Sequence, residues 1–201
     1  MDAPRSFLIS APGRYIPVMA REIVQTGDPV LRQTANEVPK ADFGSASLMS
    51  LIIDMKKLLA KEKYGVALAA SQVGEPLRLF IVAGTAIEKR KKAGAERGEE
   101  NDSEVDMPIE DQVYINPTLL KVSRTKKDKH EGCLSVRGKW GMVPRAEKAT
   151  IKAYDENGKT FTRGASGLLA HIFQHEMDHL DGVLYTDKAK ELYDEREQPE
   201  E

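Results

Sequence analysis

Two histidines and a glutamate near the C-terminal end have the spacing of a metal site. His175, Glu176 and His179 lie in the run His-Glu-Met-Asp-His. Side chains four positions apart share one face of a helix, so both imidazoles can reach one ion. Glu176 lies where its carboxylate can handle the protons of a metal-activated water without binding the metal. Two surface histidines are the alternative, but the apolar neighbours on this helix favour a buried, metal-binding pair.

A third metal ligand can come from either side of this pair. Downstream, Gly182 continues the extended zinc-protease pattern, but Tyr185 stands where that pattern has its third histidine. Asp187 and Glu191 are the remaining acidic candidates in that direction. Upstream, Cys133 is the single cysteine, and its thiolate would complete three protein ligands and leave one position open. A lone cysteine can also be a small buried hydrophobic residue, so both directions stay open here.

A run of small residues from Gly65 to Gln72 ends in a single amide. One interpretation is a tightly packed strand. The other is a backbone that a ligand can approach closely, with the Gln72 amide donating to an oxyanion as it forms.

Hydrophobic periodicity predicts the elements that must position these residues. Apolar residues recur at helical spacing from Leu48 to Leu59 and predict a helix with Ser45 or Ser47 as its N-cap. The same spacing from Gly164 to Leu180 predicts a second helix, which carries both histidines. The predicted short elements are a helix over 29–35, strands over 66–70, 77–83 and 113–122, and a hairpin over 149–163 that turns at Asn-Gly. This order predicts an α+β fold, with mostly antiparallel sheets packed around a central C-terminal metal-binding helix.

Composition narrows the class of protein. Thirty basic and 32 acidic residues give a net charge of −2, so we expect no direct nucleic-acid recognition. One cysteine excludes an intrachain disulfide. No apolar run approaches the ~20 residues of a membrane helix, so we expect no membrane partner. The N-terminal residues lack a secretory signal, which predicts a cytoplasmic location, and organelle targeting has weak support from Arg5 and Arg14.

The domain prediction is a single catalytic domain over residues 1–187. A surface insertion at about 88–112 interrupts it, with basic residues first and acidic residues after them. Residues 188–201 are polar and acidic, and we expect them to form a frayed tail.

Three segments in chain order resemble the signature motifs of peptide deformylases. They are Gly65–Gln72 (G-x-x-x-A-A-x-Q), Glu131–Ser135 (E-G-C-L-S) and Gln174–Leu180 (Q-H-E-x-D-H-L). The resemblance implies a metal-dependent amidohydrolase in which a metal-bound hydroxide removes the formyl group from formyl-methionyl nascent polypeptides. The products are formate and a free N-terminal methionine. The implied cofactor is Fe²⁺, which Ni²⁺, Co²⁺ or Zn²⁺ can replace, and a transient ribosome contact is an implied partner.

The resemblance also implies roles for single residues. Cys133, His175 and His179 would bind the metal, and Glu176 would be the general acid and base. Gln72 and the backbone N–H of Leu134 would hold the formyl oxygen. The implied substrate-binding residues are Gly65, Val66, Ala67, Gly132, Trp140, His171 and Ile172.

Some positions depart from the family pattern. Ala67 replaces a glycine, and its methyl group could crowd the peptide. Trp140 stands where the family often has an arginine, and it is either a wall of the substrate cleft or a core residue. The acidic end from Glu191 lacks the basic helix with which some members dock on ribosomes.

Two other functions remain as alternatives. A ligand downstream of His179 would favour a zinc-type endopeptidase. A closed site with four protein ligands would favour a non-enzymatic protein that only binds blocked N-termini or a structural metal.

Overall fold

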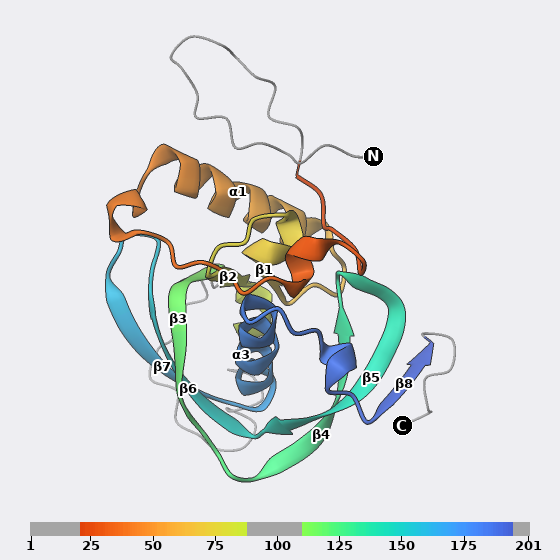
Figure 1. The fold of residues 1–201 in the computed structure, drawn as a ribbon. Coiled ribbons are helices and arrows are strands. Elements are labelled where there is room, and N and C mark those ends of the chain that lie inside the picture. The colour runs from red at the N-terminus through yellow and green to blue at the C-terminus, as the bar shows by residue number, and fades with distance from the viewer. Residues whose placement is uncertain (1–20, 88–109, 195–201) are drawn as a thin grey trace.

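The computed structural model describes residues 21–87 and 110–194, and it places two antiparallel sheets around a helix (Figure 1). The long helices of the described residues are α1 (Ala46–Lys61) and α3 (Gly167–Leu180). The five-stranded sheet contains, in spatial order, β1 (Ala67–Ala69), β2 (Leu79–Val82), β3 (Gln112–Val122), β6 (Lys148–Tyr154) and β7 (Thr160–Ser166). The three-stranded sheet contains β4 (Lys126–Cys133), β5 (Val136–Ala146) and β8 (Glu191–Asp194). Short 3-10 turns are η1 (Pro29–Arg32), η2 (Lys40–Asp42), η3 (Ala70–Val73) and η4 (Tyr185–Asp187).

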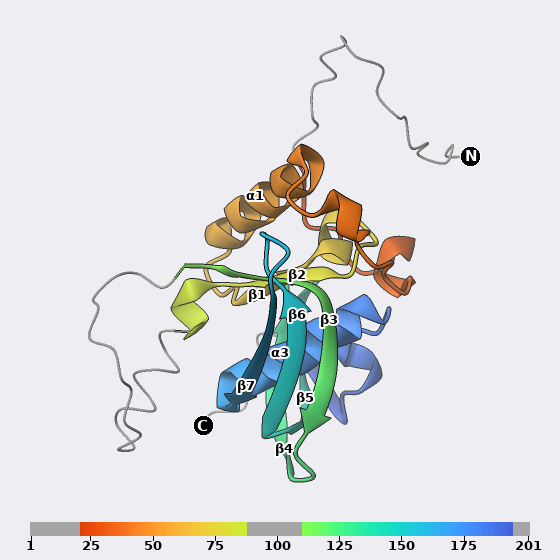
Figure 2. The same cartoon turned by 90° about the vertical axis from the view of Figure 1, so that its left-hand side faces the viewer.

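Helix α3 lies at the centre of the molecule. Figures 1 and 2 show it between the curved strands β3, β6 and β7 and the strands β4 and β5. Its Phe173 packs edge-on against Tyr114 at a ring distance of 5.2 Å, and Tyr114 stacks on Phe80 at 4.7 Å. These contacts belong to a buried apolar cluster that joins α3 to the large sheet. The predicted α+β fold with a central C-terminal helix is confirmed.

Helix α1 covers the start of the large sheet from the other side. Ser45, one of the two predicted caps, accepts a hydrogen bond from the N–H of Leu48 at 3.3 Å. The predicted stripe is buried, with Met55 fully enclosed. This packing supports β1, which is the end strand of its sheet and, within residues 21–87 and 110–194, pairs only with β2. The other edge of β1 is therefore free for a partner strand.

Three predicted boundaries are wrong. The helix expected over 29–35 is a 3-10 turn that ends at Arg32. The helix expected from Gly164 starts at Gly167, because Ser166 still pairs with Lys148 in the sheet and Gly167 breaks the strand with a φ of +58°. The prediction of a frayed tail over residues 188–201 is wrong for Glu191–Asp194, because these residues form β8 and pair with β5. Residues 195–201 lie outside the described residues.

The hairpin of β4 and β5 was not predicted from the sequence. Its first strand is dominated by charged residues, so it shows no apolar alternation. Strand β3 already starts at Gln112, and residues 88–109 of the predicted insertion lie outside the described residues. Among the described residues, no helix combines the length and apolar character needed to cross a membrane.

Candidate active site

Cys133, His175 and His179 each bring one ligand atom to a common point. The three ligand atoms lie within 4.8 Å of one another, and Sγ of Cys133 is 3.2 Å from Nε2 of His179. The histidines lie one turn apart on α3, and a register shift between Glu131 and Cys133 in β4 re-aims the end of that strand. One sulfur and two imidazole nitrogens suit a divalent metal of the zinc or iron class and leave a fourth position open.

The downstream ligand candidates have other roles in the structure. The hydroxyl of Tyr185 donates to the carbonyl of Lys139 at 2.8 Å. Asp187 forms an ion pair with Arg32, and Glu191 lies in strand β8. Among the described residues, the metal-ligating group is the one that includes Cys133. The alternative of a zinc-type endopeptidase is therefore disfavoured, because it needs a third metal ligand downstream of His179.

A buried carboxylate orients the first histidine. Oε2 of Glu131 is 2.7 Å from Nδ1 of His175, which leaves Nε2 of that ring for a metal. The other oxygen of Glu131 lies 2.6 Å from Nε of Arg145 and 2.7 Å from Nε2 of His171. Such a carboxylate–histidine pair fixes both the tautomer and the ring orientation of a metal ligand.

The charge of Glu131 is stabilised by its partners. Burial raises the pKa of this carboxyl, but the hydrogen bonds from Arg145, His171 and His175 outweigh it, and the net pKa lies well below its usual range. Arg145 also donates to Asp178 at 2.7 Å, so its buried guanidinium serves two carboxylates. The network keeps a charged acceptor in place beside the ligand group.

The two histidines have opposite pKa shifts. Burial lowers the pKa of His175, but hydrogen bonds to Cys133 and Glu131 outweigh it and raise the pKa above its usual value. Burial and the neighbouring His175 lower the pKa of His179. A metal ion binds the neutral imidazole and the thiolate, so its binding would release protons from this group.

Glu176 is a buried carboxyl beside the ligand group. It is 3% exposed, and burial raises its pKa to about 7. Within the described residues its Oε2 has no hydrogen-bond partner. An unpartnered buried oxygen is costly in a folded protein, so this atom indicates a polar partner such as an ordered water.

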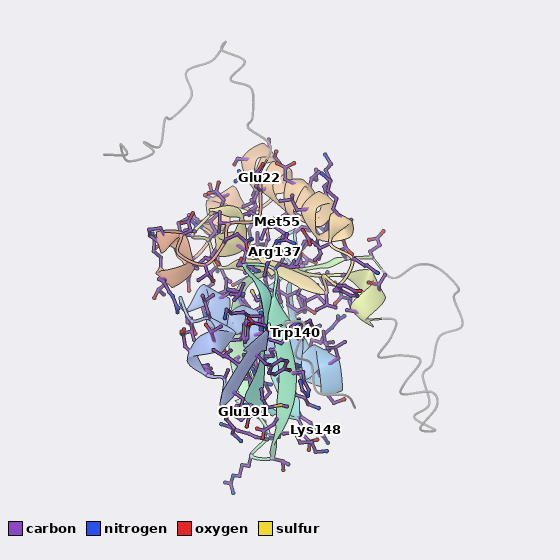
Figure 3. All side chains as sticks on the ribbon, turned by 90° about the vertical axis from the view of Figure 1, so that its right-hand side faces the viewer. Glu22, Met55, Arg137, Trp140, Lys148 and Glu191 are labelled. Atoms are coloured by element: carbon purple, nitrogen blue, oxygen red, sulfur yellow. The ribbon has the colours of Figure 1, made fainter. Side chains whose placement is uncertain are left out.

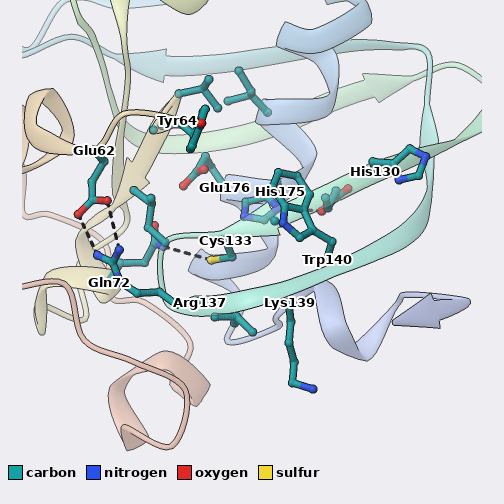
Figure 4. A pocket seen from close by; sticks show the side chains of 18 of the residues that line it. Glu62, Tyr64, Gln72, His130, Cys133, Arg137, Lys139, Trp140, His175 and Glu176 are labelled. Carbon is teal, nitrogen blue, oxygen red and sulfur yellow. Dashed lines mark hydrogen bonds and ion pairs between the residues drawn. The ribbon is translucent and has the colours of Figure 1, made fainter. Parts of the chain in front are cut away.

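Gln72 presents its amide group to the same point. The N–H of Ala69 donates to its Oε1 at 2.9 Å, which turns its Nε2 toward Sγ of Cys133 at 3.4 Å and Oγ of Ser135 at 3.2 Å (Figure 4). Leu134 follows Cys133 in the turn between β4 and β5, and its carbonyl accepts from Gln25. The Gln72 amide thus flanks the ligand group, and Leu134, the next residue after Cys133, lines the same pocket.

The ligand group opens into a pocket of about 690 Å³. All the residues implied as substrate-binding line it: Gly65, Val66, Ala67, Gly132, Trp140, His171 and Ile172. A Cβ on Gly132 would lie 3.2 Å from the Trp140 ring, so the indole covers this glycine as one wall. Figure 3 shows Trp140 with Arg137 on the side of the molecule that carries β5, Arg137 being nearer α1.

Sequence reasoning gave no role to Glu131, Arg145 or Asp178. Glu131 and Asp178 lie in motifs that carry the family resemblance, and that resemblance is the signal that could have found them. It also missed Glu62 and Arg137, which pair across the outer end of the pocket.

Comparisons with known proteins agree with this geometry. The model of the polypeptide deformylase family matches residues 20–195. A peptide deformylase of Dictyoglomus thermophilum is 41% identical over 173 residues, which is 86% of this chain and 95% of that protein. "Peptide deformylase 1A, chloroplastic/mitochondrial" of Arabidopsis thaliana is 40% identical over 83% of this chain, which spans only 60% of that longer protein.

Solved structures give the same result. The crystal structure of a peptide deformylase from Legionella pneumophila is 35% identical with a TM-score of 0.68, and the match covers 86% of this chain and 87% of that one. A class I type b peptide deformylase from Acinetobacter baumannii, bound to Met-Ala-Ser, is 27% identical with a TM-score of 0.69 over 85% and 98% of the two chains. This chain therefore belongs to the peptide deformylase family of metal-dependent hydrolases, as its three sequence motifs indicated.

Proposed function

We propose that this protein hydrolyses the N-formyl group of formyl-methionyl nascent polypeptides and releases formate and a free N-terminal methionine. One observation carries the proposal: a three-ligand group lies at the inner end of a pocket, beside an unpartnered buried carboxyl oxygen and a free sheet edge. The Acinetobacter relative is bound to Met-Ala-Ser, which has the chemistry of the expected product.

Cys133, His175 and His179 would hold the metal, which we assign as Fe²⁺ with Ni²⁺, Co²⁺ or Zn²⁺ as substitutes. When bound, such an ion makes water more acidic and polarises the formyl carbonyl. The donor set supports this assignment, and so does the carboxylate that orients His175.

Glu176 would move the protons. It takes one from the attacking water and passes it to the leaving amine, and a pKa of about 7 suits a group that must do both near neutral pH. As charge develops on the formyl oxygen, Gln72 Nε2 and the N–H of Leu134 would donate to it. The hydrogen bond from the N–H of Ala69 already fixes the Gln72 amide, so this donor needs no reorganisation during the reaction.

The peptide would add as a strand to the free edge of β1, where Gly65, Val66 and Ala67 line the pocket. The chain reaches the ligand group at Gln72, after β1. A peptide with its formyl end at the metal therefore runs antiparallel to β1, and its later residues pass Gly65. The methionine side chain would lie against Trp140, His171 and Ile172.

The compartment and the ribosome contact stay predictions. We assign the reaction to the cytoplasm, and the chloroplastic/mitochondrial name of the Arabidopsis relative makes an organelle the alternative. A transient ribosome contact would follow from a nascent-chain substrate.

Formate release from formyl-Met-Ala-Ser tests the proposal. The protein is loaded with Fe²⁺ or Ni²⁺, and the matched control is Glu176→Gln, which keeps the shape of the side chain but cannot exchange protons. We expect formate from the wild type and only background from the variant, with equal metal content in both. Equal formate from both proteins, or none from a metal-loaded wild type, would refute the proposal.

A further inference from the structure

The outer end of the pocket carries a cluster of cations. Lys61 is the last residue of α1, Glu62 and Lys63 follow it before β1, and Arg137 lies opposite at the start of β5. We call these four residues the outer rim. All four line the pocket, and three of them are cationic.

The single carboxylate of the outer rim is already paired. Glu62 accepts from both terminal nitrogens of Arg137, at 2.9 and 3.4 Å, and Figure 4 shows this pair at one end of the pocket. In the described part of the chain, no ion pair engages Lys61 or Lys63. The ammonium of Lys63 instead lies 5.1 Å from the centre of the Tyr64 ring, which also lines the pocket. The outer rim therefore presents an excess of positive charge.

The other carboxylates that line the pocket do not offset this charge. Glu131 and Glu176 lie at the inner end and are each 3% exposed. Glu131 is fully engaged with Arg145 and two histidines. A peptide side chain at the outer end thus meets cations from both walls.

The direction of the bound peptide decides which residues reach the outer rim. With the formyl end at Cys133 and the strand antiparallel to β1, the residues after methionine leave past Gly65 toward Tyr64 and Lys63. We propose that the outer rim is a subsite that selects acidic side chains at the second and third positions of the substrate. This inference rests on the proposed function, because that function sets the direction of the peptide.

The test compares two amidated substrates, formyl-Met-Asp-Asp and formyl-Met-Lys-Lys, on the metal-loaded enzyme at low ionic strength. We expect kcat/KM to favour the acidic peptide by roughly threefold to tenfold, since exposed charge pairs have modest strength. The preference should act through KM and shrink as salt rises. Amidation removes the terminal carboxylate, which would otherwise mask the side chains.

The decisive variant is the double substitution Lys61→Glu and Lys63→Glu, which should reverse the preference. The matched control is Lys57→Glu with Lys152→Glu, two exposed lysines that do not line the pocket. It changes the net charge by the same amount and should keep the wild-type preference. The proposed subsite would be overturned if the double variant of the outer rim kept the wild-type preference, or if the wild type showed no preference.

A binding measurement separates this inference from the proposed function. Trp140 is the single tryptophan and lines the pocket, so its fluorescence can report binding of amidated Met-Asp-Asp and Met-Lys-Lys without any turnover. Tighter binding of the acidic peptide, reversed in the rim variant, supports the subsite even if no formate is released. Formate release with equal binding and equal kcat/KM for both peptides would refute the subsite and leave the proposed function intact.

Discussion

Two arginine–glutamate pairs, each with its glutamate in the lining of the pocket, differ mainly in burial. At the inner end, Arg145 and Glu131 are 4% and 3% exposed and meet at 2.6 Å. At the outer end, Arg137 and Glu62 meet at 2.9 Å, but the side chain of Arg137 is 58% exposed. The same chemical groups at similar distances thus lie in two different dielectric surroundings.

Burial decides what each pair can do. Removing one partner of a buried pair leaves an uncompensated charge, which costs about 3–5 kcal/mol, whereas exposed pairs contribute roughly 0.2–1 kcal/mol. The inner pair can therefore hold a metal ligand in one orientation. The outer pair is weak enough to open or shift beside a substrate, so it can adjust to the side chains that reach the outer rim.

The most drastic way to break the inner end is Cys133→Ala. Loss of the thiolate leaves two histidines, so we expect the metal content to fall to a small fraction of the wild-type value and formate release to fall to the level of Glu176→Gln. Metal analysis after desalting measures this. Asp187→Ala is the control, because that carboxylate was a downstream ligand candidate. Full metal retention by the Cys133 variant would contradict the assignment of this ligand.

Arg145→Leu and Arg137→Leu test the comparison directly. We expect the free energy of unfolding to fall by about 3–5 kcal/mol for the first, because Glu131 and Asp178 both lose a buried partner. For the second we expect less than about 1 kcal/mol. Denaturant unfolding of both metal-free variants gives the two values. Similar losses of unfolding free energy in the two variants would show that burial does not decide how strongly each pair stabilises the protein.

Gln72→Leu removes one donor from the inner end. We expect kcat to fall about 10²–10³-fold, which corresponds to about 2.7–4 kcal/mol of barrier, with little change in KM or metal content. Ala69 also loses its acceptor in this variant, so unfolding is measured beside the kinetics. An unchanged kcat would assign the role of oxyanion donor to other groups.

Much of this site could be predicted from the sequence, because its residues lie in short motifs. The ligand candidates, Glu176 and Gln72 were all found by type and spacing. The two long helices were found because their buried stripes repeat with the helical period. The alternation of β6 and β7 around Asn157-Gly158 predicted that hairpin.

The rest depends on contacts between distant segments. Apart from the family resemblance, nothing in the sequence marks Glu131 or Arg145 as buried, and only the pairing of β4 with β5 buries them together. Strand β8 was missed because it has only four residues and its stability comes from pairing with β5. The Glu62–Arg137 pair joins residues 75 positions apart, so no local pattern could indicate it.

The smallest expected effect concerns an exposed pair outside the pocket, between Arg32 in η1 and Asp187 in η4. The hydrogen bond from Arg32 holds the pKa of Asp187 below its usual value, against an opposing effect of burial. A carboxyl whose pKa is lowered by folding stabilises the protein above its unfolded pKa of 3.8, and this contribution is lost as the pH falls through the lower folded value. We expect Asp187→Asn to lower the free energy of unfolding by less than about 1 kcal/mol at pH 7, because the pair is solvent-screened.

The pH dependence sharpens this last prediction. The difference in unfolding free energy between wild type and Asp187→Asn should be constant from pH 7 to about pH 5 and should shrink at lower pH, as the wild-type carboxyl becomes protonated and loses its charge. The asparagine can still accept from the N–H of Leu184, so the comparison isolates the charge. Arg32→Gln should show the same pH dependence. A difference that persists at a pH where the wild-type carboxyl is fully protonated would mean that Asp187 acts through packing, and exposed pairs would then have to be judged by their contacts as well as by their charge.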